Sequence, residues 1–233
     1  MAPSISLPDT SLLADPERLL ALSYAPAERR AALAALWRLD ERMGTIVATA
    51  REPAIGAMRL LWWRDALTGL DTPGAMPPAE PLLGEIALRL LPAGLPGRSI
   101  AEIEEGWAAL LEAEAPGEAE ILAHGEARGG PLFALSAMLL GAVPEDAGRA
   151  GEGWALADLG HRLSDPAARH FAREQAADRL EEVAVGRWPA ALRPLGLLAT
   201  FARGDAAMPA ARLRRQGSPK RLFRGLAYRL TGR

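Results

Sequence analysis

Pairs of carboxylates spaced four residues apart on a helix are the first candidates for chemistry in this chain. That spacing places both side chains on one helix face, where together they could hold a divalent cation. Glu174 and Asp178 have this spacing. On a helical wheel they lie opposite Ala168, Ala172 and Leu180, so we expect them on a solvated face rather than in a metal site.

Two single charges fall inside apolar stripes instead. Asp40 lies in the middle of the apolar sector of a helix over 26–50, and Arg59 lies inside the apolar sector of a helix over 53–70. A buried charge must be paired or must change its pKa. We therefore predict a direct ion pair between Asp40 and Arg59, and the alternative is that one or both line a polar pocket.

Other reactive residue types point to no further centre. The chain has no cysteine, which excludes disulfides, thiolate zinc sites and cysteine nucleophiles. His124, His161 and His170 lack metal-ligand spacing, so we expect a surface or capping role for each. Ser136 lacks the strand-turn-helix context of a nucleophile. These residues predict neither a metal nor a cofactor.

The elements that carry these residues are helices. The 233 residues, 49% of them hydrophobic, are enough for one globular domain over 1–233, and the near absence of alternating strand patterns predicts an all-α bundle. Asp15-Pro16, Asp165-Pro166 and Ser218-Pro219 mark helix starts, and Ser99 with Glu102 reads as a capping box. We expect further helices over about 26–50, 53–70, 79–91, 118–141 with a break at Gly129-Gly130-Pro131, 145–163 and 189–203.

The two ends of the chain differ from the body. Residues 1–14 carry no targeting or membrane-spanning pattern and are expected to be flexible, which favours a cytoplasmic protein. Residues 212–233 hold eight basic residues and no acidic one, and predict a basic amphipathic helix. This helix could dock its apolar side on the acidic body, or contact an anionic membrane surface or a protein partner at the inner membrane face. Nucleic acid is not expected. The basic residues proposed for this surface are Arg212, Arg214, Arg215, Lys220, Arg221 and Arg224.

One stretch carries a resemblance to a known family. Arg51-Glu52-Pro53, followed by MRLLWWRDAL from Met58 to Leu67, resembles the squalene/phytoene synthase family, in particular its divergent branch that includes a complex I assembly factor with a phytoene-synthase-like domain. The resemblance implies an all-α isoprenoid-synthase bundle around a central cavity. It also implies condensation of prenyl diphosphates, in which two inward-facing aspartate pairs hold Mg²⁺ ions that neutralise the diphosphate oxygens.

This chain departs from the family pattern at both aspartate pairs. The first pair would fall near Gly44, Thr45 and Ala48, none of which offers a carboxylate. The second would fall near Arg162 and Pro166. The nearest acids are Asp40, Glu41, Asp158 and Asp165, and we expect Asp158 and Arg162, at i and i+4, to form an ion pair.

Two functional hypotheses follow from that departure. The first is a family member without metal-dependent prenyl transfer, which acts as a lipid-binding or isoprenoid-binding protein or as an assembly module. The alternative is an active, Mg²⁺-dependent prenyltransferase whose carboxylates come from other positions, including Asp65. The tryptophans are expected in the core, where several could wall a cavity for an isoprenoid chain. The residues expected to line the pocket are Asp40, Glu41, Arg59, Trp62, Asp65, Asp158 and Arg162.

Overall fold

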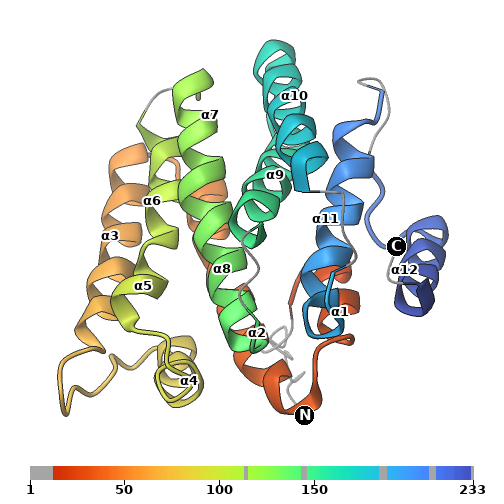
Figure 1. Cartoon of the computed structure of the whole chain (residues 1–233). Coiled ribbons are helices and arrows are strands. Elements are labelled where there is room, and N and C mark those ends of the chain that lie inside the picture. Colours follow the sequence, from red (N-terminus) through yellow and green to blue (C-terminus); the bar gives the residue numbers. More distant parts are fainter. Residues whose placement is uncertain (1–12, 113–114, 143–145, 184–187, 210–213, 232–233) are drawn as a thin grey trace, which may run out of the picture.

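Helices and the loops between them make up the computed structural model, which describes residues 13–112, 115–142, 146–183, 188–209 and 214–231 (Figure 1). No strand occurs among those residues, which confirms the all-α prediction. The elements are α1 (Pro16–Leu22), α2 (Ala27–Thr49), α3 (Pro53–Gly69), α4 (Pro81–Arg89), α5 (Gly97–Ala101), α6 (Ile103–Ala108), the short η1 (Ala109–Leu111), α7 (Glu118–His124), the π-helix η2 (Gly125–Gly129), α8 (Gly130–Leu139), α9 (Ala147–Gly160), α10 (Pro166–Val183), the short η3 (Ala190–Leu192), α11 (Arg193–Ala206) and α12 (Pro219–Thr231).

The helix starts follow local capping chemistry in two of the predicted cases. The Asp15 carboxylate accepts from the Glu17 backbone N–H at 2.7 Å, and the Asp165 carboxylate accepts from the Ala168 N–H at 2.7 Å. Each satisfies an N–H that the first helical turn leaves without a partner.

The predicted capping box at Ser99 is wrong. Helix α5 begins two residues earlier, at Gly97. The carboxylate of Asp71, on the distant loop after α3, accepts from the N–H groups of Gly97 and Arg98 at 2.5 and 3.0 Å. These hydrogen bonds lower the pKa of Asp71 below its ordinary value. A cap supplied from 26 residues away leaves no local sequence signal.

Helix α9 lies against α8, α10, α11 and η2, and most of its residues are buried. Glycines permit the closest of these contacts: a Cβ added at Gly151 would lie only 2.0 Å from the carbonyl oxygen of Gly129. The helix that contains the sequence GGP, residues 129–131, is not interrupted there as predicted, because η2 runs directly into α8. The glycines instead let two backbones approach. The contact brings η2 within reach of the α9 side chains.

Helix α3 buries a face that is rotated from the predicted one. Its buried face consists of Leu60, Trp63 and Leu67, whereas Trp62 is 45% exposed. Arg59 lies on the exposed face. Apolar residues occur on both faces of this outer helix (Figure 1), so their spacing alone could not select the side that packs on the bundle.

Both ends of the described chain contact its body. Leu13 is buried, and residues 1–12 lie outside the described part, so the flexibility of residues 1–14 stays a prediction. Helix α12 packs on α1 and α11 (Figure 1), but it does so through Arg221, Gly225 and Tyr228. The prediction that its apolar side docks is therefore wrong. In the described part of the chain, every helix is too short or too polar to cross a membrane.

Candidate functional site

A pocket of about 290 Å³ opens between α2, α6, η2 and α9 beside the residues that precede α1. Its floor holds charges of both signs, and its wall includes the small residues Gly44, Thr45 and Ala48. The charged residues that line it are Asp15, Arg18, Asp40, Glu41, Arg128, Asp158 and Arg162.

Asp40 is fully buried at this floor, as predicted, but its partner is not Arg59. Its Oδ1 accepts from Arg128 Nε at 2.8 Å and from Trp107 Nε1 at 2.8 Å, and its Oδ2 accepts from Arg128 Nη2 at 3.0 Å and from Arg18. The predicted pair with Arg59 is wrong, because the exposed face of α3 carries that arginine away from the floor. Both oxygens of Asp40 are engaged.

Arg128 joins the two carboxylates at the floor of the pocket. While Nε and Nη2 bind Asp40, its Nη1 donates to Asp158 Oδ2 at 3.1 Å. The guanidinium lies between two indole rings, 4.1 Å from the centroid of Trp107 and 4.7 Å from that of Trp154, so cation–π attraction adds to the ion pairs. Arg128 is thus only 2% exposed, with carboxylates paired to the edge of its guanidinium and indole rings beside its faces.

His124 completes the environment of Arg128 one helical turn away. Its Nδ1 lies 2.6 Å from the Gly106 carbonyl oxygen and its Nε2 lies 3.2 Å from Arg128 Nη1. Because a carbonyl only accepts, the proton is on Nδ1 and Nε2 accepts from the arginine. Burial and the nearby charge of Arg128 lower the pKa of His124 to about 3, so it is neutral at pH 7. The predicted surface or capping role is wrong for this histidine.

The electrostatics of the two carboxylates follow from their partners. Burial alone would raise the pKa of Asp40, but the charges of Arg128 and Arg18 outweigh burial and hold its pKa well below the ordinary value. Burial opposes ionisation of Asp158 in the same way, and the charges of Arg128, Arg162 and Arg214 again lower its pKa. Both groups are therefore carboxylates at neutral pH.

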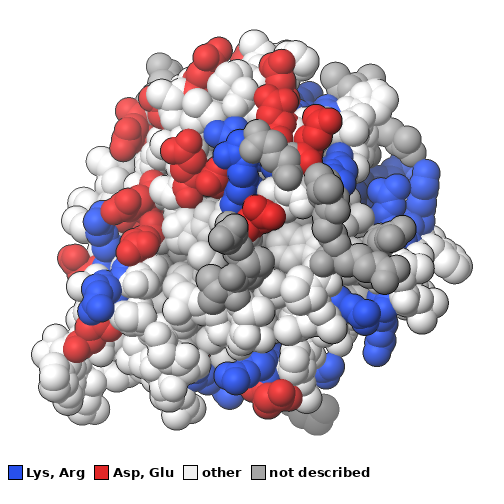
Figure 2. Space-filling model, in the orientation of Figure 1, with Lys and Arg blue, Asp and Glu red and all other residues white. Residues whose placement is uncertain are grey.

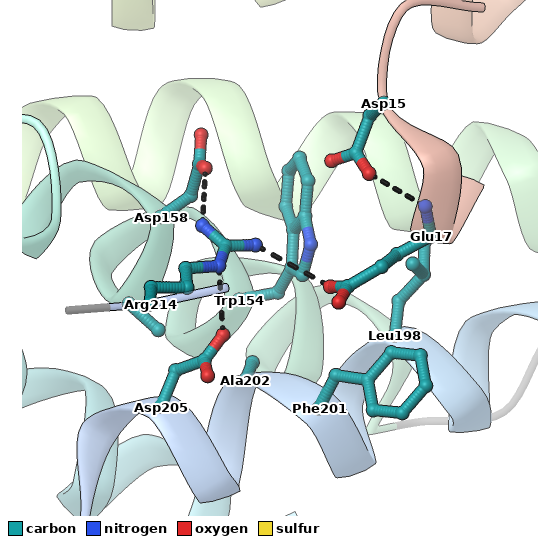
Figure 3. Close-up of a pocket in the computed structure, with 10 residues that line it drawn as sticks. Asp15, Glu17, Trp154, Asp158, Leu198, Phe201, Ala202, Asp205 and Arg214 are labelled. Atoms are coloured by element: carbon teal, nitrogen blue, oxygen red, sulfur yellow. Dashed lines mark hydrogen bonds and ion pairs between the residues drawn. The ribbon is translucent and has the colours of Figure 1, made fainter. Parts of the chain in front are cut away.

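Asp158 also connects the pocket to the tail of the chain. Arg162 Nε donates to its Oδ2 at 3.1 Å, which is the predicted i, i+4 pair, and Arg214 Nη1 donates to its Oδ1 at 2.9 Å. Figure 3 shows Arg214 between three acids, with Asp205 3.0 Å and Glu17 3.6 Å from its guanidinium nitrogens. Residues from α1, α9, α11 and the segment before α12 meet here.

The predicted basic surface divides into two groups. Arg214 and Arg221 point inward: Arg221 Nη2 donates to Glu17 at 2.7 Å and to Asp205 at 3.0 Å, so neither arginine is available to a partner. This part of the surface prediction is wrong, because acids on α1 and α11 draw both side chains inward. Arg212 lies outside the described residues. The exposed members are Arg215, Lys220 and Arg224.

The remaining predicted pocket residues separate as well. Glu41 lines the pocket, and its carboxylate accepts from the N–H groups of Ala14 and Asp15 at 2.8 and 3.2 Å. Arg59 and Trp62 line a different groove, of about 370 Å³, on the outer side of α2 and α3. Asp65 is exposed on α3 and lines neither.

The residues missed by the prediction of the pocket include Arg18, Trp107, His124 and Arg128. One signal could have found two of them. His124 and Arg128 are spaced i, i+4 directly before the GGP break, and a π-helical turn at such a break often accompanies a functional site. Pro131 has no N–H to donate, which favours an irregular turn at that point.

The fold and the pocket define an all-α protein of the isoprenoid-synthase type. The family model for squalene/phytoene synthase matches residues 13–179, which is well over half of the chain, and the chain belongs to that family. It matches no curated protein and no solved structure with which it was compared.

The Mg²⁺ ions that the family implies do not fit the residues present. Gly44, Thr45 and Ala48 line the pocket but supply no carboxylate, and a Cβ at Gly44 would lie 2.8 Å from the Trp107 ring, so the indole occupies that space. Asp40 and Asp158 bind Arg128 instead. Within the described ranges, no three His, Asp or Glu side chains are grouped to hold a metal.

Proposed function

We propose that this chain binds an isoprenoid or a related lipid in the open pocket without metal-dependent prenyl transfer, as a binding or assembly module. The observation that carries the proposal is the guanidinium of Arg128, which joins Asp40 on α2 to Asp158 on α9. The family pattern would place its first aspartate pair on α2 and its second near Arg162 and Pro166, after the end of α9. A cation that belongs to the protein lies between Asp40 and Asp158.

The contacts of this cation oppose metal binding. A metal ion would have to displace Arg128 from both carboxylates, and the arginine would then remain buried between two indole rings without its partners. Removing one partner from a buried ion pair costs about 3–5 kcal/mol. The fixed charge therefore favours a pocket that keeps its shape without metal.

The polar lining also favours a particular head group. Acids and arginines both line the pocket, and Arg18 and Arg128 already donate to Asp40. A diphosphate would meet few unused donors and several carboxylates. An uncharged polar head, such as an alcohol, avoids this repulsion, and its apolar chain can lie along the wall formed by Gly44, Ala48 and Trp107.

Calorimetric titration of the purified chain with farnesol and with farnesyl diphosphate tests the proposal. We expect farnesol to bind, the dissociation constant to be the same with and without Mg²⁺, and farnesyl diphosphate to bind more weakly. Ala48→Phe narrows the pocket and is expected to weaken binding about tenfold or more, whereas Ala54→Phe, at an exposed position on α3, is the matched control. Binding that is absent, or equal in the two variants, would contradict the proposal.

A second candidate function is prenyl transfer with relocated carboxylates. It is favoured by one observation, that Asp40, Glu41 and Asp158 line the same pocket. The exposed Asp65 and the capping Asp165 do not contribute to this set. Incubation with farnesyl and geranylgeranyl diphosphate and Mg²⁺ separates the two functions: a condensation product that disappears in Glu41→Gln and Asp158→Ala variants would establish transfer and defeat the first proposal.

A further inference from the structure

Helix α12 is attached to the body by its polar side. Arg221 binds Glu17 and Asp205 and lies 4.7 Å from the Phe201 ring centroid. On the same side, the backbone carbonyl of Gly225 accepts from the Tyr24 hydroxyl at 2.8 Å.

Tyr228 completes the docked face. It is only 1% exposed. A Cβ at Gly196 of α11 would lie 2.0 Å from its hydroxyl oxygen, so the tyrosine fits a gap that only glycine leaves. These contacts hold the helix in one rotational setting.

That setting leaves the apolar side of α12 outside. Leu222, Phe223, Leu226 and Leu230 are 42%, 74%, 51% and 85% exposed. At 100° per residue these four side chains form one continuous sector, centred opposite the docked face. Burying such residues against the body would have been the default for a soluble amphipathic helix, so an exposed apolar row of this kind indicates an interaction surface.

Cations border the apolar sector on both sides. On the helical wheel Lys220 and Arg224 follow it on one edge and Arg229 on the other, and all three are exposed. No acidic residue occurs after Asp205. At the right-hand edge of the molecule in Figure 2, where Figure 1 places α12, basic side chains are visible and acidic ones are not.

We propose that α12 lies in the plane of an anionic lipid surface, with its apolar row in the boundary between headgroups and acyl chains and its flanking cations among the lipid phosphates. The cations that flank the apolar row favour a lipid surface over a second copy of the chain. Two α12 helices packed through their apolar rows would bring their own cations together, whereas anionic headgroups complement cations on both edges.

Vesicle flotation tests the proposal on the full chain. We expect binding to vesicles of phosphatidylcholine with phosphatidylglycerol, little binding to phosphatidylcholine alone, and weaker binding as salt increases, since salt screens the headgroup attraction. Leu230→Asp is expected to reduce binding about tenfold or more. Leu88→Asp, on α4, is the matched control. Leu88 is 71% exposed and lies far from α12 in the sequence.

The absence of cysteine from the sequence allows a second readout. A polarity-sensitive fluorophore attached to a Leu230→Cys variant is expected to shift to shorter wavelength with the anionic vesicles, and the same label at Leu88→Cys is expected not to shift. Equal binding of the Leu230→Asp and Leu88→Asp variants would overturn the proposal. So would a dimer of the free chain that Leu230→Asp abolishes, because a second copy would then cover the apolar row.

Discussion

Arg128 and Asp40 meet through two parallel hydrogen bonds, Nε to Oδ1 at 2.8 Å and Nη2 to Oδ2 at 3.0 Å, although 88 residues separate them. This planar, two-bond geometry is the strongest form of arginine–carboxylate contact. The third nitrogen, Nη1, reaches Asp158. One side chain thereby ties α2 to α9 at the floor of the pocket.

Replacing Arg128 with methionine tests the strength of this bridge. We expect the free energy of unfolding to fall by about 3–5 kcal/mol, because Asp40 and Asp158 stay buried and lose their shared partner. Arg162→Met is the matched control: Arg162 also contacts Asp158, but its side chain is 56% exposed, so the loss should stay below about 1 kcal/mol. Urea unfolding followed by circular dichroism measures the free energy of unfolding of both variants. Equal losses would contradict the role of Arg128 as the buried bridge between the two carboxylates.

The neutral state of His124 predicts a pH dependence of stability. Its pKa in the folded chain is about 3, below the value of about 6.5 for an unfolded histidine. Between these values the unfolded chain binds more protons, so stability is complete above pH 6.5 and is lost as the pH falls. We expect a slope approaching about 1.4 kcal/mol per pH unit from this one group.

Between about pH 6.5 and 5 the histidines dominate, because carboxylates with depressed pKa values, such as Asp40, lose their contribution only as the pH falls below about 5. Burial also lowers the pKa of His161, so that group contributes to the slope in the same window. His124→Asn keeps a donor near the Gly106 carbonyl and should flatten the dependence of unfolding free energy on pH in this window. His170→Asn, at an exposed position, should leave the slope unchanged. A slope unaltered by His124→Asn would show that another group titrates.

The contact between Gly44 and Trp107 predicts opposite effects for two glycine-to-alanine substitutions. Gly44→Ala places a Cβ 2.8 Å from the indole and should cost about 1–3 kcal/mol. Gly84→Ala, inside α4 with nothing within 4 Å, should stabilise the chain by about 0.5–1 kcal/mol through helix propensity. In a double-mutant cycle with Trp107→Phe, the Gly44→Ala cost should shrink. If the costs of Gly44→Ala and Trp107→Phe are additive, the indole does not cause the destabilisation by Gly44→Ala.

Attachment of α12 depends on Arg221. Arg221→Met leaves Glu17 and Asp205, which are 3% and 1% exposed, with less compensating charge, and we expect α12 to open locally at a cost of about 3 kcal/mol or less. Trypsin cleavage after Lys220 and Arg224 should then accelerate under native conditions. Arg215→Met, an exposed arginine just before the helix, should leave the cleavage rate unchanged.

The all-α class, two helix caps, the burial of Asp40 and the Asp158–Arg162 pair were all predictable from the sequence. Each depends on residues within about one helical turn, where periodicity and capping chemistry act. Helical phase on α2 placed Asp40 inside, because apolar residues gather on one side of that helix. On α3 they occur on both sides, and the same reasoning placed Arg59 on the wrong face.

What only the tertiary structure decided is the choice of partners. Burial of Asp40 requires a cation, but the local sequence does not say where along the chain that cation lies. The partners of Asp40 are Arg18, 22 residues before it, and Arg128, 88 residues after it. The same holds for α12, whose amphipathic pattern determines two faces without saying which one docks. Arg221 forms ion pairs with Glu17 on α1 and Asp205 on α11, and this leaves the apolar face of α12 exposed. Long-range ion pairs decided both the partners of Asp40 and the docked face of α12. A local sequence pattern shows only that a buried charge must be paired.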